Sequence, residues 1–313
     1  MKPPVSSYNP MRGIALKVVS VAFFVAMAGL IKAAGQIPAG QIVFFRSIFA
    51  ILPILVVLAW RHELRTAMRT ERPLSHFIRG TVGTCGMALT FFALTRLPLP
   101  EAITLSYAQP LLVVAFSALF IGEVVRVYRW TAVAIGLVGV VIVSWPKLTL
   151  FSGEGTLGSD EAVGVLAAFA AAAVSAVAVL LIRRLVQTER TSTIVLWFSL
   201  TATLLSLLTV PFGWTMLDPW QASCLIVAGI SGGIGQLLMT ESYRNADAST
   251  IAPFEYTSLL LGIAVGYFAF GDLPTAYTIV GGLIVTGAGL FIIWRERALG
   301  LERGTARKVT PPQ

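Results

Sequence analysis

Runs of about twenty apolar residues recur along this chain and constrain its fold more than any other feature. An α-helix rises about 1.5 Å per residue, so such a run crosses the roughly 30 Å hydrocarbon layer of a bilayer. Stretches such as VAFFVAMAGLI and AAFAAAAVSAVAVLL lack the alternation of a transmembrane β-strand. Only 12% of the residues are charged, about half the share in a soluble domain. The sequence therefore predicts an all-α integral membrane protein.

Ten segments of the chain are candidates for membrane-spanning helices. They are predicted near 13–34, 41–60, 77–95, 101–121, 130–146, 162–182, 193–212, 221–241, 250–270 and 276–294. Short loops that hold proline, glycine or charged residues separate them, as in TRLPLPE and FGDLPTAY. The tails at 1–10 and 296–313 lie outside the predicted spans.

The net charge of +8 is a feature shared with nucleic-acid-binding proteins, but the positions of the basic residues explain it differently. With the N-terminus in the cytoplasm, most of the 23 lysines and arginines fall in cytoplasmic segments, and only Lys32, Arg96 and Lys147 fall outside. The positive-inside rule then places both termini in the cytoplasm. The basic residues are expected to contact lipid headgroups rather than nucleic acid.

The chain also repeats itself at an offset of about 150 residues. Laying ITLSYAQPLLVVAFSALFIGE (103–123) over APFEYTSLLLGIAVGYFAFGD (252–272) pairs Tyr107 with Tyr256 at an offset of 149. Each repeat holds five predicted spans, an odd number, so the second repeat enters the membrane from the opposite side. The prediction is two inverted five-helix repeats, an arrangement typical of secondary transporters with a site near the midplane.

With its ten spans, its duplication and the wording SYAQPLLVVAFSALFIGE, the chain resembles the drug/metabolite transporter superfamily, in its EamA-type branch. In that family a proline within the fourth span and an acidic residue closing it recur, and Pro110 and Glu123 match. The second repeat departs from this pattern, with Leu259 where the proline would fall. The resemblance implies EamA-like repeats at 11–147 and 162–295, and carriage of a small metabolite across a bacterial inner membrane without ATP hydrolysis.

For the substrate, segments such as FFRSIFAILPIL and TESYRNADASTIAPFEYTS resemble the bacterial riboflavin-uptake members of this superfamily. Riboflavin uptake is therefore the first expectation. Export of amino acids or amphiphilic drugs, and carriage of S-adenosylmethionine, stay open as alternatives. Transport is expected to be coupled to protons or to no ion. The sequence does not specify the oligomeric state.

Motifs of an enzyme or an ATP-driven pump are missing from the sequence. It holds no GxxxxGK[ST] or HExxH pattern, and its two cysteines have no metal-site spacing. A sensor would need a soluble output domain, for which the C-terminal tail is too short. We expect no enzymatic activity, no cofactor and no metal.

Polar and aromatic residues inside the spans are the candidates for lining a substrate cavity between the repeats. They are Arg46, Tyr107, Gln109, Trp197, Gln236, Glu255 and Tyr256. Pro110 and Pro253 lie beside them, and a proline inside a helix removes one backbone hydrogen bond and kinks the helix. The two tyrosines either pair across the pseudo-symmetry axis or act as interface anchors.

Glu255 lies about 8 Å inside the membrane if its span begins near Thr250. A carboxylate at that depth is costly and usually faces a cavity. There it accepts a hydrogen bond from the substrate or carries a coupling proton. The alternative is that it reaches the interface or caps a helix.

Two basic residues lie inside the first two spans. The long stem of Lys17 favours snorkelling to the interface. Arg46 has two interpretations, contact with an anionic or carbonyl-rich substrate or pairing with Glu101. Trp197 aligns with Arg46 at an offset of 151 and is expected to stack on a planar ligand.

Other features of the spans are interpreted as structural. Gly229 and Gly233, like Gly262 and Gly266, have the GxxxG spacing that lets helices approach closely in lipid. The acidic residues Glu123 and Asp272 are expected to pair with loop arginines, and Glu241 to lie close to the cytoplasm.

Overall fold

The computed structural model describes residues 10–121, 127–145, 160–185, 188–245, 254–255 and 257–298, and these residues form helices and loops without a β-strand. The α-helices are α1 (Pro10–Ala33), α2 (Ala39–Trp60), α3 (Pro73–Leu94), α4 (Leu99–Ser106), α5 (Ala108–Ile121), α6 (Val127–Ser144), α7 (Asp160–Leu185), α8 (Thr191–Leu207), α9 (Pro219–Asn245), α11 (Thr257–Phe270) and α12 (Ala276–Ala298). Two short 3₁₀ helices, η1 (Leu64–Thr66) and η4 (Val210–Phe212), lie in connections. The predicted all-α class is confirmed for these residues.

Six of the helical segments are long and apolar enough to cross a membrane. They are Met11–Ala33, Ala39–Trp60, Pro73–Leu94, Leu99–Phe116, Asp160–Ile182 and Pro219–Ser242. Shorter apolar helices cover Trp130–Val143, Ser192–Leu207, Thr257–Phe270 and Ala276–Ile292. The prediction of a multi-pass membrane protein is confirmed to this extent.

The helix predicted over 101–121 is divided at Tyr107, where α4 ends and α5 begins. Pro110 is the third residue of α5 and has no N–H, so it cannot donate to the carbonyl of Ser106. The chain tightens instead, and the Tyr107 amide donates to the Thr104 carbonyl at 3.1 Å. The division brings the tyrosine side chain into the interior of the protein.

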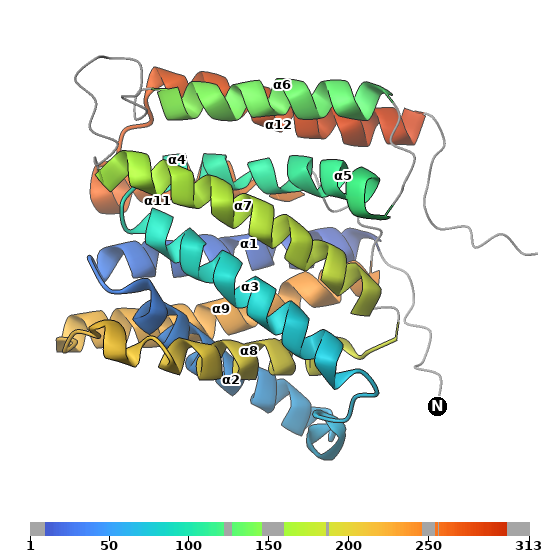
Figure 1. The fold of residues 1–313 in the computed structure, drawn as a ribbon, viewed down its shortest axis with the longest axis vertical. Helices are drawn as coiled ribbons and strands as arrows, with labels where there is room; N and C mark the ends of the chain where they lie inside the picture. The colour runs from blue at the N-terminus through green and yellow to red at the C-terminus, as the bar shows by residue number, and fades with distance from the viewer. Residues whose placement is uncertain are drawn as a thin grey trace, which may run out of the picture.

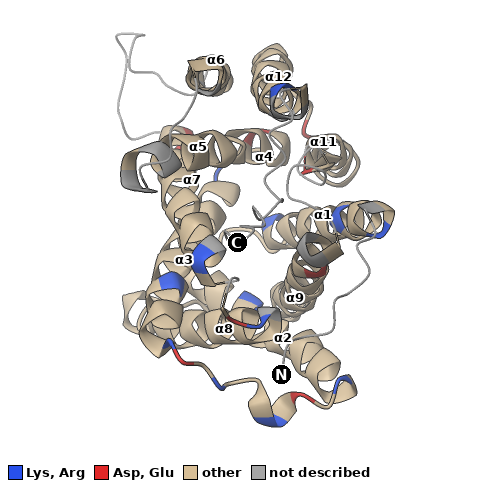
Figure 2. Cartoon of the chain, turned by 90° about the vertical axis from the view of Figure 1, so that its right-hand side faces the viewer, with Lys and Arg blue, Asp and Glu red and all other residues tan. Residues whose placement is uncertain are grey.

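The helices form a bundle in which neighbours in space are often distant in sequence (Figure 1). α1 packs on α9, α3 packs on α7, and α2 packs on both α8 and α9. Figure 2, in which most helices are seen end-on, shows α6 and α12 side by side at one edge of the bundle. In that pair a Cβ atom placed on Gly139 would lie 2.9 Å from the Gly281 carbonyl oxygen, so glycine sets their separation.

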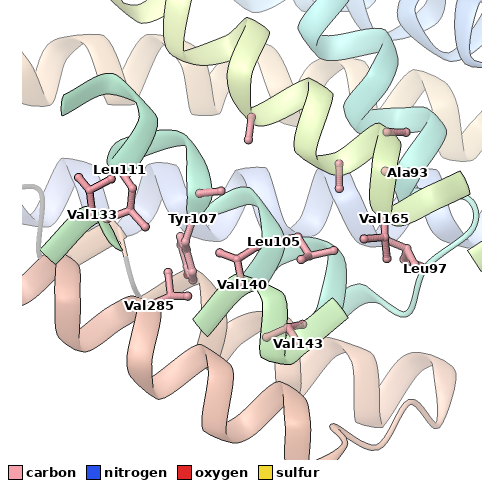
Figure 3. Close-up of a cluster of buried hydrophobic side chains, with 14 of the residues drawn as sticks. Ala93, Leu97, Leu105, Tyr107, Leu111, Val133, Val140, Val143, Val165 and Val285 are labelled. Carbon is pink, nitrogen blue, oxygen red and sulfur yellow. The ribbon is translucent and has the colours of Figure 1, made fainter. Parts of the chain in front are cut away.

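The largest cluster of buried apolar side chains surrounds the division between α4 and α5 (Figure 3). Tyr107 lies there beside Val285 of α12, and Leu111 and Val140 belong to the same cluster. This packing holds the divided helix in place from several sides.

Closely packed glycines account for the other tight helix contacts. Cβ atoms placed on Gly229 and Gly233 would lie 2.9 Å from the Phe45 carbonyl oxygen and 2.7 Å from the Ala50 carbonyl oxygen of α2. The prediction that these glycines serve helix packing is confirmed.

Candidate functional site

Two buried clusters of charged side chains lie inside the apolar bundle, and the first joins α1 to the segment before α11. Lys17 of α1 is 1% exposed, and its Nζ lies 3.3 Å from Oε2 of Glu255, whose side chain is 46% exposed. The prediction that Lys17 snorkels to the interface is wrong. Its stem points into the protein, where a carboxylate compensates a charge whose burial alone would cost several kcal/mol.

The divided fourth helix meets the same cluster through Tyr107. Its hydroxyl shares a hydrogen bond with the Ser258 hydroxyl of α11, and Ser258 Oγ also lies 2.7 Å from the Glu255 carbonyl oxygen. Tyr107 is 3% exposed, so it is not an interface anchor. Tyr256 and Pro253 lie outside the described residues, so their predicted roles stay predictions.

The second cluster is built around Phe198 of α8, which contacts two arginines. The guanidinium carbon of Arg79 on α3 lies 4.0 Å from the centre of the Phe198 ring, and that of Arg46 on α2 lies 5.7 Å from it. Both arginines are buried, at 5% and 4% exposure. Each cluster joins basic side chains of the first half of the chain to a residue of the second half, Glu255 or Phe198.

Neither arginine has an acidic partner among the described residues. The Nε atoms of Arg46 and Arg79, and NH1 of Arg79, are buried without a hydrogen bond. The alternative pairing of Arg46 with Glu101 does not occur among the ion pairs of these residues. A cation–π contact returns about 2 kcal/mol when desolvated, less than the several kcal/mol that burying each ion costs. The charge of this cluster is left largely uncompensated.

Trp197 precedes Phe198 and has a partner within the protein. Its ring stacks on His76 of α3 at 5.6 Å and 27°, and its Nε1 donates to the Met68 carbonyl at 3.4 Å. The face of the indole toward His76 is therefore not available to a planar ligand. His76 also contacts an acidic residue, since its Nε2 lies 3.7 Å from Oε2 of Glu189.

A series of polar and aromatic groups leads from the loop before α8 toward the arginine cluster. Glu189 accepts a hydrogen bond from Thr70 Oγ1 at 2.6 Å and contacts His76. Arg79 follows His76 by one helical turn on α3 and leads to Phe198. The series connects the side of the bundle predicted to be cytoplasmic with the arginine cluster.

The remaining predicted lining residues are less central. Gln109 and Gln236 are half-buried, and Pro110 is exposed. None of the three side chains is hydrogen-bonded to the two clusters among the interactions of the described residues.

Two acidic residues interpreted as structural do have partners. Asp272 pairs with Lys32 at 2.9 Å, which corrects the predicted pairing with a loop arginine, because the end of α1 comes closer to it. Glu241 lies 3.7 Å from Arg61, as suits a position near the cytoplasm. Glu123 lies outside the described residues.

Arg79 is the site residue that sequence reasoning missed. It lies near the start of the predicted span 77–95, among the basic residues that the positive-inside rule assigns to the cytoplasm. A charged residue within a span indicates a functional position by default. That signal was present in the sequence.

Comparison with known proteins identifies the architecture. The model of the EamA-like transporter family matches residues 11–145 and 162–295. The chain is 29% identical to the pseudopaline exporter CntI of Pseudomonas aeruginosa strain UCBPP-PA14, over 88% of this chain and 94% of the relative. It is 29% identical to the riboflavin transporter of Vibrio cholerae, over 83% and 84% of the two chains. It is 26% identical to the S-adenosylmethionine uptake transporter of Rickettsia felis, over 82% and 83%.

A solved structure described as "Crystal structure of protein" has the same fold. Its TM-score is 0.65 at 20% identity, and the match covers 92% of this chain and 98% of that one. The predicted resemblance to the drug/metabolite transporters is confirmed by the family match.

Proposed function

This chain belongs to the EamA-like transporter family, and on that premise we propose that it is a secondary carrier of a small organic metabolite. The observation that carries the proposal is the meeting of charged side chains inside an apolar bundle. Lys17 and Glu255 come from opposite halves of the chain, and so do Arg46 and Phe198. Charges at such depth mark a substrate or ion pathway.

We further propose that ten spans form two inverted five-helix repeats. Three glycines of α3 recur in α9 at a constant offset of 149, with Gly80, Gly83 and Gly86 matched by Gly229, Gly232 and Gly235. The contacts of the last pair support the repeat. A Cβ atom on Gly86 would lie 2.7 Å from Ser175 Oγ of α7, and one on Gly235 would lie 3.2 Å from the Phe24 ring of α1.

The two contacted residues, Phe24 and Ser175, are themselves separated by 151 residues, the offset expected for the early part of the repeat. The contact of α3 with α7 is thus the counterpart of the contact of α9 with α1. Two equivalent halves that pack on each other in this way have two equivalent arrangements. Alternating access of an interior site to the two sides of the membrane follows from exchanging them.

The proposed location is a bacterial inner membrane, since the relatives are bacterial transporters. Both termini are proposed to lie in the cytoplasm, and the distribution of basic residues supports this orientation. The proposed partners are the substrate and membrane lipid, with no enzymatic activity. Gln109, Gln236 and Tyr256 complete the proposed lining of the substrate path, together with the buried clusters. Glu255 is the proposed carrier of a coupling proton.

Riboflavin uptake is the first substrate hypothesis to test, since the sequence resembles riboflavin-uptake members and two relatives are riboflavin transporters. Export is the second hypothesis, and the similarity to a pseudopaline exporter favours it.

The test is rescue of a riboflavin-auxotrophic bacterium at limiting external riboflavin, with labelled riboflavin accumulation measured beside an empty-vector control. Rescue with saturable accumulation establishes both substrate and direction. Absence of rescue from a well-expressed, membrane-inserted protein rejects riboflavin uptake and directs the search to efflux of organic metabolites from loaded cells. An Arg96→Gln variant, altered outside the two clusters, is expected to behave as the wild type.

A further inference from the structure

We propose that Arg46 and Arg79 bind the acid group of an organic anion, and that the transported substrate is of this class. This inference rests on the proposed carrier function and narrows it to a chemical class of substrate.

The first step is that both arginines are buried and charged. Each is about nineteen-twentieths buried, and three of their guanidinium nitrogens have no hydrogen bond. A guanidinium group does not lose its proton in proteins, so burial cannot neutralise it as it would a lysine. These buried N–H donors therefore need a hydrogen-bond acceptor, which a bound ligand can supply.

The second step is that the acidic side chains near the bundle interior are already used. Among the described residues, Glu255 pairs with Lys17, Glu241 with Arg61, Asp272 with Lys32, and Glu189 contacts His76. Glu101, which is 5% exposed, also has an interaction partner. Phe198 supplies a ring face to both arginines but no hydrogen-bond acceptor. Among the described residues, no carboxylate balances the charge of Arg46 and Arg79.

The third step is the geometry. The sum of the two distances to the Phe198 ring, 9.7 Å, is the upper limit on the separation of the guanidinium carbons. The proposed acid group lies where it accepts hydrogen bonds of about 2.9 Å from both guanidinium groups. Gly232 of α9 lets the Arg46 side chain approach the helix backbone closely, since a Cβ atom there would lie 3.2 Å from its Nε.

Carboxylate and phosphate groups share the required chemistry, because each presents several anionic oxygens to the planar guanidinium fork. Riboflavin has no ionised acid group near neutral pH. The arginine cluster therefore favours an acidic metabolite over riboflavin as the transported substrate.

The test measures binding to the purified full-length protein in detergent by its thermal unfolding midpoint. The probes are two matched pairs, benzoate against benzamide and phenyl phosphate against benzyl alcohol. The variants are Arg46→Gln, Arg79→Gln and Arg79→Lys. The lysine variant keeps the positive charge but loses the planar guanidinium group and its paired N–H donors. The control is Arg96→Gln, because Arg96 also stacks on a phenylalanine, Phe92 at 3.7 Å, but is partly exposed and lies 3.9 Å from Asp160.

We expect at least one anion to stabilise the wild type in a saturable way, while its neutral partner does not. Its apparent affinity is expected to fall at least about tenfold in each Gln variant, as loss of a charged hydrogen bond does, and to be unchanged in Arg96→Gln. Arg79→Lys is expected to retain part of the affinity. Stabilisation by a carboxylate alone or by a phosphate alone identifies the acid group.

Two results overturn the proposal: neither anion stabilises the wild type beyond its neutral partner, or stabilisation persists unchanged in Arg46→Gln and Arg79→Gln. We expect the Gln variants to unfold no earlier than the wild type without ligand, because they remove an uncompensated buried charge. A large loss of stability in both would instead assign the arginines a structural role and would also overturn it.

Counterflow of the bound probe in proteoliposomes separates this inference from the carrier function. Binding without counterflow supports the anion site and contradicts the carrier. Counterflow of a neutral substrate that is unchanged in the Gln variants supports the carrier and contradicts the anion site.

Discussion

Lys17 and Glu255 form an ion pair of 3.3 Å in which the lysine is buried and the carboxylate is half exposed. The buried lysine therefore depends on the ion pair to compensate its charge more than the half-exposed carboxylate does. The lysine is enclosed by the protein, whereas the carboxylate has an exposed part.

Removing the carboxylate alone is expected to destabilise the protein. Glu255→Gln leaves a buried ammonium charge, at a cost of about 1–3 kcal/mol, below the 3–5 kcal/mol of a fully buried pair because the carboxylate is half exposed. The double variant Lys17→Met/Glu255→Gln removes both charges and is expected to recover most of that loss. Thermal unfolding in detergent gives both values, and a double variant less stable than Glu255→Gln contradicts the pairing.

The same substitution tests proton coupling once a transported substrate is in hand. Gln keeps a hydrogen-bonding group at this position but cannot take up a proton. If Glu255 carries the coupling proton, transport by Glu255→Gln is expected to lose the response to an imposed pH gradient that the wild type shows. A response identical to that of the wild type rules out this role and leaves hydrogen bonding to the substrate.

The glycine contacts between helices predict a selective loss of stability. Gly233→Ala places a methyl group where the Ala50 backbone already lies, since a Cβ would be 2.7 Å from the carbonyl oxygen. We expect a loss of about 1–3 kcal/mol. The matched control is Gly287→Ala in α12, whose added carbon meets no atom within 4 Å and which is expected to be neutral or slightly stabilising. Equal unfolding midpoints for the two variants would contradict the close packing.

Much of the fold was predictable because the membrane imposes a simple rule on the sequence. Long apolar runs must form helices in lipid, where every backbone group needs an internal partner. The division of the fourth helix was also visible, because Pro110 removes the donor that Ser106 would need. The fold class and family therefore followed from the sequence.

The candidate site was harder to predict because it depends on which helices face each other. The partner of Lys17 comes from a segment more than two hundred residues away, so its burial could not be derived from the length of its stem. Arg79 lies close to a helix end in sequence but deep beside Phe198 in space. The ring of Trp197 is oriented by His76 of a neighbouring helix, a contact that no local pattern encodes.

Alternating access is the central proposal for this protein, and cysteine labelling tests it without knowledge of the substrate. Met27 is half-buried, and its sulfur would lie 2.6 Å from a Cβ atom on Gly232, beside Arg46. Met27→Cys is made in a Cys85→Ala/Cys224→Ala background and exposed to a membrane-impermeant maleimide in right-side-out and in inverted vesicles. Met68→Cys, at an exposed loop position predicted to be cytoplasmic, is the control and is expected to react only in inverted vesicles.

Alternating access predicts that Met27→Cys reacts in both kinds of vesicle, because the interior opens to each side in turn. Reaction from one side only, at every incubation time, would contradict it.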